Sequence, residues 1–243
     1  MINHAIIPAR GGSKGILKKN IKYLGGIPLI AYSIAIAKLS KKINRIIVST
    51  DDPEIAEIAI KFGAEVPFLR PKEISQDSST DLEFMLHILN WLNINNEIIP
   101  KYFIHLRPTT PIRSEEIIDK AIESIMNNNE ATSLRSAHLC PESPFKWFSK
   151  DPSNTYYQPL FLSGEKDILN MPRQIVPSAY IPNGYVDILI SDYILKNNSL
   201  HGDKILAFES PFCVEIDTLD DFKYLEYQIL NENFTFVNRI SWS

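Results

Sequence analysis

The sequence predicts a doubly wound α/β fold, in which a mostly parallel sheet is covered by helices on both faces. Short β-rich runs alternate with helical patterns over the first half of the chain, as in consecutive βαβ units. Hydrophobic residues make up 44% of the chain, which is enough for a sizeable core. A length of 243 residues fits one α/β domain or two small ones, and we expect a single domain over residues 1–243.

Strands are predicted where apolar and β-branched runs are bounded by turn residues. Four of them alternate with helical patterns in the first half of the chain, and regular structure resumes with two more after residue 180. The six predicted strands are Ala5–Pro8, Arg45–Ser49, Val66–Leu69, Tyr102–Leu106, Gly184–Ser191 and Ile205–Glu209.

Four helices are predicted, each after a residue whose side chain can accept a hydrogen bond from the free N–H groups of a first turn. The first also has Pro53 at its first position, where the missing N–H is harmless. The second combines Thr80 with Glu83 in capping-box spacing. The four expected caps are Asp52, Thr80, Ser114 and Thr218.

A stretch rich in Pro, Ser and aromatic residues interrupts this pattern from about His138 to Pro172. A polar linker would be poor in aromatic residues, so we expect this segment to pack against the body of the protein or against a second subunit. We interpret it as an excursion from the fold.

Positive charge is concentrated in residues 1–50, which hold nine Lys or Arg and no Asp or Glu, although the whole chain has a formal charge of −4. A general nucleic-acid binder spreads basic contacts over a face, so we expect no nucleic-acid partner. Nowhere do about 18 uninterrupted apolar residues occur. We therefore expect a soluble, cytoplasmic protein without a membrane partner.

The same region holds five of the nine glycines and opens with an apolar strand that runs into Pro8-Ala-Arg-Gly-Gly-Ser-Lys-Gly15. Backbone N–H groups of such a loop supply hydrogen-bond donors, and the basic side chains at Arg10, Lys14, Lys18 and Lys19 neutralise charge. The loop therefore predicts a nucleotide phosphate site. It matches neither GxxxxGK[ST] nor GxGxxG, so a plain surface turn remains an alternative.

Apart from those six strands, the short segment around Glu215 and Asp217 is also predicted to be extended. The two carboxylates stand two residues apart in it, and alternation places both on one face. Such a pair suits a hard divalent cation with oxygen ligands. Asp217 can at the same time help Thr218 to begin the last helix.

The string from Pro8 to Asn20, continued by Gly26-Ile-Pro-Leu, resembles the opening of the acylneuraminate cytidylyltransferases, the CMP-sialic acid synthetase family. The resemblance covers nearly the whole chain in the family's order. It implies a Rossmann-like fold of the nucleotidyltransferase type and a homodimer, with residues 138–172 as a dimerisation and sugar-site excursion. The other matching stretches are Ser49–Asp51, Arg70-Pro71, Asp77–Thr80, Leu106–Arg113, Pro172–Gln174, Pro182–Gly184 and Glu215–Thr218.

The resemblance also implies roles for individual residues. Those expected to bind CTP are Arg10, Gly11, Gly12, Ser13, Lys14, Lys19, Asn20, Asp77, Ser78 and Thr80. Capping of a helix is the favoured role of Thr80. Arg10, Lys14, Lys19 and Asp217 are expected to be catalytic. Because the family's acidic pair binds Mg²⁺, we expect this ion at Glu215 and Asp217, with Asp217 the better ligand.

The residues that the resemblance assigns to the sugar are Arg107, Lys146, Arg173, Gln174, Asn183, Gly184 and Asp187. For Lys146 a salt bridge at the rim is an equal alternative. The chain departs from the family at Leu17, where Pro is usual. It also has Arg107 where Gln is common and Asp187 where an aromatic residue is common. The last two departures bear on which sugar is used.

The expected reaction is transfer of CMP from CTP to the anomeric hydroxyl of a sialic acid-like α-keto acid sugar, which gives CMP-sugar and pyrophosphate. The same reaction on legionaminate, pseudaminate or an octulosonate sugar is an alternative. A noncatalytic nucleotide-binding protein with this fold is a second alternative. Retention of all four expected catalytic residues argues against it.

Overall fold

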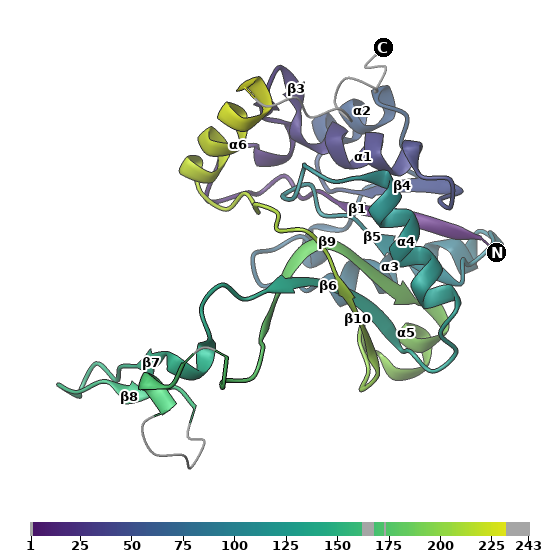
Figure 1. Ribbon diagram of the computed structural model, residues 1–243. Helices are drawn as coiled ribbons and strands as arrows, with labels where there is room; N and C mark the ends of the chain where they lie inside the picture. The colour runs from purple at the N-terminus through teal and green to yellow at the C-terminus, as the bar shows by residue number, and fades with distance from the viewer. Residues whose placement is uncertain (1, 162–167, 173, 232–243) are drawn as a thin grey trace.

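The computed structural model describes residues 2–161, 168–172 and 174–231, and its centre is a six-stranded sheet in the order β10-β6-β9-β5-β1-β4 (Figure 1). Neighbours pair in parallel at β1/β4, β1/β5 and β6/β10, whereas β9 is antiparallel to both β5 and β6. The predicted mostly parallel sheet is confirmed. Its strands are β1 (Asn3–Pro8), β4 (Arg45–Ser49), β5 (Tyr102–His105), β6 (Ser133–Leu139), β9 (Tyr180–Ile190) and β10 (Ile205–Glu209).

Helices cover both faces of the sheet (Figure 1). One face packs against α1 (Leu29–Leu39), α2 (Pro53–Lys61), α4 (Glu115–Met126) and α6 (Leu219–Asn231) and forms the larger apolar core. The opposite face packs against α3 (Asp81–Ile94) and α5 (Ser191–Asn197). A two-stranded hairpin of β2 (Tyr23–Leu24) and β3 (Ile27–Pro28) precedes α1.

The four predicted helices begin where the caps indicate. The Asp52 side chain accepts hydrogen bonds from the N–H groups of Glu54 and Ile55, and Thr80 forms a capping box with Glu83. At the start of α6, Thr218 Oγ1 accepts from the Asp221 N–H at 3.2 Å. Helix α4 follows Ser114, but the serine side chain makes no capping hydrogen bond.

The strand predicted over Val66–Leu69 is wrong. Only isolated bridges join this segment to β4, at Ile47 with Glu65 and at Thr50 with Leu69. Pro67 has no N–H to donate, so a continuous ladder cannot form across it. The segment nevertheless follows the edge of β4, because the Arg70 N–H donates to the Thr50 carbonyl at 2.7 Å.

The described residues of the segment from 140 to 179 form an arm that projects from the sheet (Figure 1). Its base is closed where the Cys140 N–H donates to the Ala179 carbonyl at 2.8 Å, next to the ends of β6 and β9. The arm contains β7 (Phe148–Ser149) and β8 (Gln158–Pro159), with the 3-10 turns η3 (Pro144–Lys146) and η4 (Ile168–Asn170). Tyr156 is 75% exposed and Tyr157 66%, so these rings do not pack against the body. Packing against a second subunit stays a prediction.

Among the helices that the structure describes, none combines the length and the apolar character needed to cross a membrane.

Candidate active site

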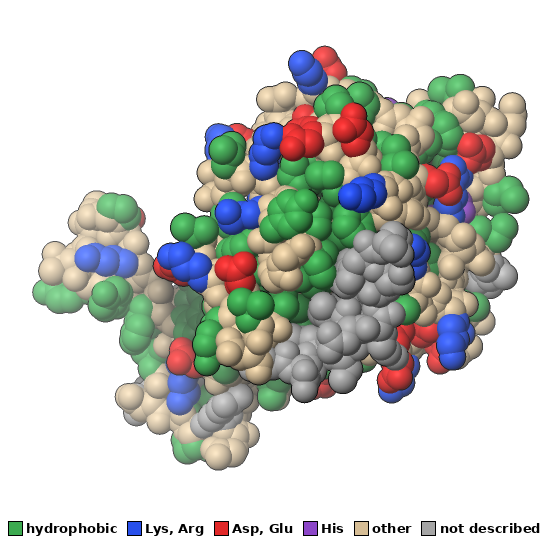
Figure 2. Space-filling view, turned by 90° about the horizontal axis from the view of Figure 1, so that it is seen from above, with side chains coloured by type: hydrophobic (Ala, Val, Ile, Leu, Met, Phe, Trp, Pro, Cys, Tyr) green, Lys and Arg blue, Asp and Glu red, His purple; other side chains and the backbone are tan. Residues whose placement is uncertain are grey.

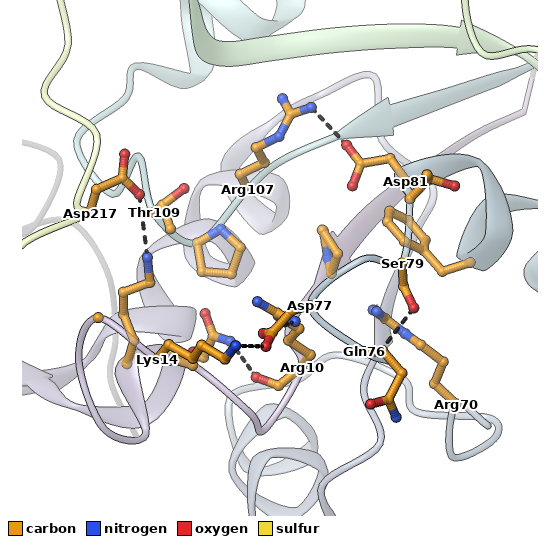
Figure 3. A pocket seen from close by; sticks show the side chains of 18 residues that line it. Arg10, Lys14, Arg70, Gln76, Asp77, Ser79, Asp81, Arg107, Thr109 and Asp217 are labelled. Carbon is orange, nitrogen blue, oxygen red and sulfur yellow. Dashed lines mark hydrogen bonds and ion pairs between the residues drawn. The ribbon is translucent and has the colours of Figure 1, made fainter. Parts of the chain in front are cut away.

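A cleft of about 500 Å³ lies at the carboxyl ends of β1 and β5 (Figure 3). In open α/β sheets this edge is where ligands bind. The chain leaves β1 at Pro8 into the phosphate loop, defined here as residues 9–20, and β5 is followed by Arg107 and Thr109, which line the cleft. The first turn of α3 and the segment between β10 and α6 close its other sides.

Two cations of the phosphate loop converge on one carboxylate in the cleft. Arg10 Nη1 lies 2.8 Å from Asp77 Oδ1, and Lys14 forms an ion pair with the other oxygen of Asp77 (Figure 3). The hydrogen bond from Lys14, aided by Arg10, lowers the pKa of Asp77, although partial desolvation opposes this. A negative group thus lies between the two cations that the resemblance assigns to the triphosphate.

Glycines allow the phosphate loop to fit between two acidic segments. The Gly11 N–H donates to Asp51 Oδ1 at 2.9 Å, and a Cβ at Gly11 would lie 2.7 Å from Asp52 Oδ2. A Cβ at Gly15 would lie 2.8 Å from the Asp217 carbonyl oxygen. Both contacts are closer than real Cβ atoms allow. At Gly15 the opposing atom belongs to the backbone, so this position favours glycine strongly, whereas at Gly11 the Asp52 side chain would have to shift. Gly12 faces open space, because a Cβ there would meet nothing within 4 Å.

Lys19 and Asn20 hold the loop together and join it to the segment before α6. Lys19 Nζ donates to the Ile216 carbonyl at 2.7 Å and lies 3.6 Å from Asp217 Oδ1. Asn20 Nδ2 donates to the Arg10 carbonyl at 2.9 Å. These contacts place Asp217 at the wall of the cleft, beside the loop cations (Figure 3).

Glu215 and Asp217 are both exposed and flank the buried Ile216, which agrees with the predicted alternation. The strand predicted around them is wrong. The Ile216 N–H donates to the Thr109 carbonyl at 2.8 Å, but no ladder continues from this bond. Glu215 Oε1 accepts from Thr109 Oγ1 at 3.0 Å, and of the two carboxylates only that of Asp217 lines the cleft.

The described residues contain no group of three or more His, Cys, Asp or Glu side chains arranged to hold a metal ion. Magnesium in nucleotide enzymes needs fewer protein ligands, because one or two carboxylates, substrate phosphates and waters complete its octahedron. An exposed Asp217 with Glu215 two residues away fits that requirement. Mg²⁺ at this place stays a prediction.

The cleft also contains residues to which the sequence assigned no individual role. Arg70 is buried, donates to the hydroxyl and carbonyl oxygens of Ser49, and lies 4.8 Å above the Phe84 ring. Burial lowers the pKa of Arg70 to about 10. Arg70 belongs to a stretch that matches the family, but no local pattern pairs it with Phe84. The others are Pro8, Gly15, Gln76, Ser79, Asp81, Pro108 and Thr109.

Arg107 lies at the end of the cleft near α3 and is shared by two carboxylates. Its Nη2 is 2.9 Å from Asp81 Oδ2, and its Nη1 is 2.8 Å from Asp187 Oδ2. Burial alone would lower the pKa of Arg107, but the attraction of the two carboxylates is stronger, so the pKa of Arg107 is raised overall. The Asp187 side chain is only 2% exposed and reaches the cleft through Arg107.

Asn183 and Gly184 lie behind the cleft. Asn183 is buried and donates to Ser210 Oγ at 2.8 Å. Gly184 has φ +61°, and its carbonyl accepts from Arg113 Nη2 at 3.1 Å. In this chain both residues therefore contribute to the packing of the first half of β9.

Two other expected sugar residues lie on the arm. Lys146 donates to the Met171 carbonyl, and Gln174 lines a separate cavity of about 350 Å³ at the arm's base. Arg173 lies outside the described residues. Arg107 is thus the one member of the described sugar set that lines the cleft. Of the nucleotide set, Gly11, Gly12 and Ser78 do not line it. Contact of either set with substrate stays a prediction.

A family model described as cytidylyltransferase matches residues 4–157. CMP-N,N'-diacetyllegionaminic acid synthase of Campylobacter jejuni is 31% identical over 246 residues, covering 94% of this chain and 95% of that protein. Pseudaminic acid cytidylyltransferase of Campylobacter jejuni is 41% identical over 128 residues, covering 53% of this chain and 55% of that protein.

A solved structure of CMP:2-keto-3-deoxy-manno-octonic acid synthetase complexed with CTP has a TM-score of 0.71 and 16% identity, covering 96% of this chain and 100% of that chain. At this identity the likeness shows the fold alone, and it agrees with the expected Rossmann-like α/β architecture. The family model matches more than half of the chain, and the legionaminic acid relative aligns with nearly all of it. This chain therefore belongs to the cytidylyltransferase family, as its resemblance to the acylneuraminate cytidylyltransferases predicts.

Proposed function

We propose that this protein transfers CMP from CTP to the anomeric hydroxyl of a sialic acid-like α-keto acid sugar, with release of pyrophosphate. The observation that carries the proposal is the meeting of Arg10, Lys14, Lys19 and Asp217 at one cleft in a chain of this family. These residues come from opposite ends of the sequence, and direct contacts of Lys19 join the phosphate loop to the segment that carries Asp217.

The chain's residues act mainly by positioning and by neutralising charge. The triphosphate of CTP takes the place of Asp77 between Arg10 and Lys14. The anomeric oxygen of the sugar forms a bond to the α-phosphorus, and the bond from that phosphorus to the bridging oxygen breaks. Pyrophosphate leaves beside the two loop cations, and the hydroxyl proton passes to water.

The reaction is tested by incubating the protein with CTP, Mg²⁺ and one sugar per tube. The sugars are N-acetylneuraminate, legionaminate, pseudaminate and 3-deoxy-octulosonate, because relatives are named for legionaminic and pseudaminic acids and a structural neighbour for an octonic acid. CMP-sugar is read by mass and pyrophosphate by a coupled assay. Product is expected in at least one of the three nonulosonate tubes. CTP binding without product in any tube would favour the noncatalytic alternative.

We propose that Asp217, assisted by Glu215, holds Mg²⁺ on the nucleotide. When bound, the ion would neutralise triphosphate charge and polarise the reacting groups. The Asp217→Ala variant is expected to lower kcat by on the order of 10²-fold or more. The melting temperature of this variant should not change, because the Asp217 side chain is 74% exposed and its ion pair with Lys19 is long, at 3.6 Å.

The matched control is Asp220→Ala, which removes a carboxylate that is 91% exposed, pairs with Lys223 and does not line the cleft. It should keep wild-type turnover and the wild-type Mg²⁺ requirement. A normal rate in Asp217→Ala, with an unchanged dependence on Mg²⁺, would remove the metal assignment.

We also propose a homodimer in which the arm contacts the partner subunit. The resemblance implies this assembly, and the exposed aromatic side chains of the arm support it. The cytoplasmic location expected from the sequence is part of the same proposal.

A further inference from the structure

A row of polar residues crosses the middle of the sheet beside the cleft. Asp187 on β9 is directly opposite His105 on β5 and Arg135 on β6. Directly opposite residues share one face of a sheet, so these three side chains lie together. The same face carries the apolar core under α3, and the row marks its boundary with the cleft.

Charges alternate along a line that begins at the cleft, in the order Asp81, Arg107, Asp187 and Arg135. The first three are joined by the two hydrogen-bonded ion pairs of Arg107. Arg135 Nε then lies 3.5 Å from Asp187 Oδ1, on the side away from Arg107. We call these four residues the charge array.

Arg135 balances the charge array. Asp81 and Asp187 share the single positive charge of Arg107, so these three residues together are one unit negative. A buried carboxylate is costly unless it is paired and hydrogen-bonded, and Asp187 is the most buried member. Arg135 Nε is itself buried and has no hydrogen-bond partner among the described residues, so it serves Asp187 through charge alone.

The neighbouring histidines do not take over this role. Burial, followed by the positive charge of Arg107, lowers the pKa of His105 well below its usual value. Burial also lowers the pKa of His201, which contacts Ser133 Oγ at 2.9 Å. Both rings are therefore mostly neutral at pH 7, and Arg135 is the cation that faces Asp187 from β6.

We propose that Arg135 is a positioning residue that holds the Arg107 side chain in place through Asp187. Arg107 in turn donates hydrogen bonds to an uncharged acceptor group of the sugar, a hydroxyl or an amide carbonyl. The inference rests on the proposed function and deepens it. A guanidinium already neutralised by two carboxylates offers little net charge to the sugar carboxylate. Its remaining N–H groups are still donors of fixed direction, which suit a neutral oxygen.

Arg135 affects the selectivity for the sugar because Asp187 is attracted to two cations, Arg107 and Arg135, and their balance determines where the Arg107 guanidinium lies. Without Arg135, Asp187 has Arg107 as its one counter-ion, and the Arg107 guanidinium moves toward β9 and away from Asp81. The donors that face the cleft then lose their alignment. The nucleotide end of the cleft, around Arg10 and Lys14, is held by Asp77 and is independent of this change.

The test is a double-mutant cycle of Arg135→Gln and Arg107→Gln, with initial rates measured for CTP and for the best sugar. We expect Arg135→Gln to raise the KM for the sugar about tenfold and to leave the KM for CTP unchanged. In the Arg107→Gln background the same change should cost no more than about twofold, because residues that act as a unit are not additive. Arg135→Lys should restore most of the loss.

The matched control is Lys204→Gln, which removes an exposed cation paired with Glu130 near the neighbouring strand β10. This variant should have the wild-type KM values for CTP and for the sugar. Additive effects of the two arginine substitutions, or equal changes in both KM values, would overturn the proposal. If Arg135→Gln does not fold, Arg135→Gln with Asp187→Asn removes both charges together, and the same rise in sugar KM is expected.

A second readout does not depend on turnover. The Arg107 Nε–Hε signal in a ¹⁵N NMR spectrum should be sharp in the wild-type protein, broadened in Arg135→Gln and restored in Arg135→Lys. An unchanged signal in Arg135→Gln would overturn the positioning role even if no sugar were turned over. Failure of the proposed reaction is recognised separately, by absence of product with the wild-type protein.

Discussion

Of the cations that line the cleft, Arg70 alone forms no ion pair among the described residues; the others are each paired with a carboxylate of the same chain, but the pairs differ in burial. The Asp77 side chain, which holds Arg10 and Lys14, is 42% exposed, whereas that of Asp187, which holds Arg107, is 2% exposed. Exposed pairs contribute little stability, so a triphosphate with several charges can replace Asp77. Breaking a buried pair is strongly unfavourable. The phosphate end of the cleft can therefore exchange its partners, and the Arg107 end is fixed.

Adjacent glycines in the phosphate loop should differ sharply in their tolerance of alanine. In Gly11→Ala the new methyl group meets Asp52 Oδ2, and Asp52 is the cap of α2. We expect a loss of about 1–2 kcal/mol in the free energy of unfolding, the usual cost of a damaged cap. In Gly12→Ala the new methyl group meets nothing within 4 Å. This substitution should therefore raise the free energy of unfolding by no more than about 1 kcal/mol. Urea denaturation at 25 °C measures both.

Equal stabilities of the two alanine variants would show that Asp52 moves aside without loss of its capping bonds. That outcome would contradict the close packing of the loop against α2. A Gly12→Ala protein less stable than Gly11→Ala would contradict it as well.

At the scale of single elements, the parts that the sequence predicts best have local causes. Strand β4 has the predicted bounds because a short apolar run ends at Thr50-Asp51-Asp52-Pro53. Helices α2 and α3 begin at their predicted caps because Asp52, Thr80 and Glu83 satisfy N–H groups within a few residues. The phosphate loop is predictable for the same reason, since its glycines and cations are consecutive.

The elements that escape prediction owe their structure to distant partners. Strand β9 begins at Tyr180, before Pro182 and Gly184, because β6 pairs with it through an irregularity between Arg135 and Ala137. Strand β6 itself carries buried serines that read as loop residues. Ser136 Oγ accepts from the Val186 N–H at 2.9 Å, a bond that requires β9.

The candidate site likewise has a part with local causes, the phosphate loop, and a part that depends on residues distant in the sequence. Asp81 and Phe84 join the cleft because α3 begins beside it, and Arg70 joins it because its segment follows the edge of the sheet beyond β4; both are results of topology. No spacing in the sequence relates Asp81 to Arg107 or Asp187. Arg107 and Asp187 are recognisable as departures from the family pattern, but their pairing with each other follows from the strand order β5-β9-β6.

At the scale of the whole molecule, the arm is the feature that a monomer explains least. Its side chains make ring contacts with each other, at Phe145 with Phe161 and at Phe148 with Tyr157, but much of their surface is left open. Figure 2 shows the arm standing off the body with hydrophobic side chains on its surface. Aromatic side chains are enriched in the buried centres of protein interfaces. An interface of standard size, about 1,600 Å² in total, would cover such a surface.

The homodimer is tested by light scattering of the wild-type chain, whose mass is 27.7 kDa, and of a Tyr156→Ser/Leu160→Ser double variant. The wild-type protein should have twice the chain mass at micromolar concentration. Tyr156 is 75% exposed and Leu160 45%, so their loss should spare the fold. If the partner buries them, each contributes about 1.5–3 kcal/mol, and the dissociation constant should rise at least about 100-fold. Tyr227→Ser, which removes a 65% exposed ring on α6, is the control and should stay dimeric. A monomeric wild-type protein would defeat the dimer, and a dimeric double variant would place the interface away from these two arm residues.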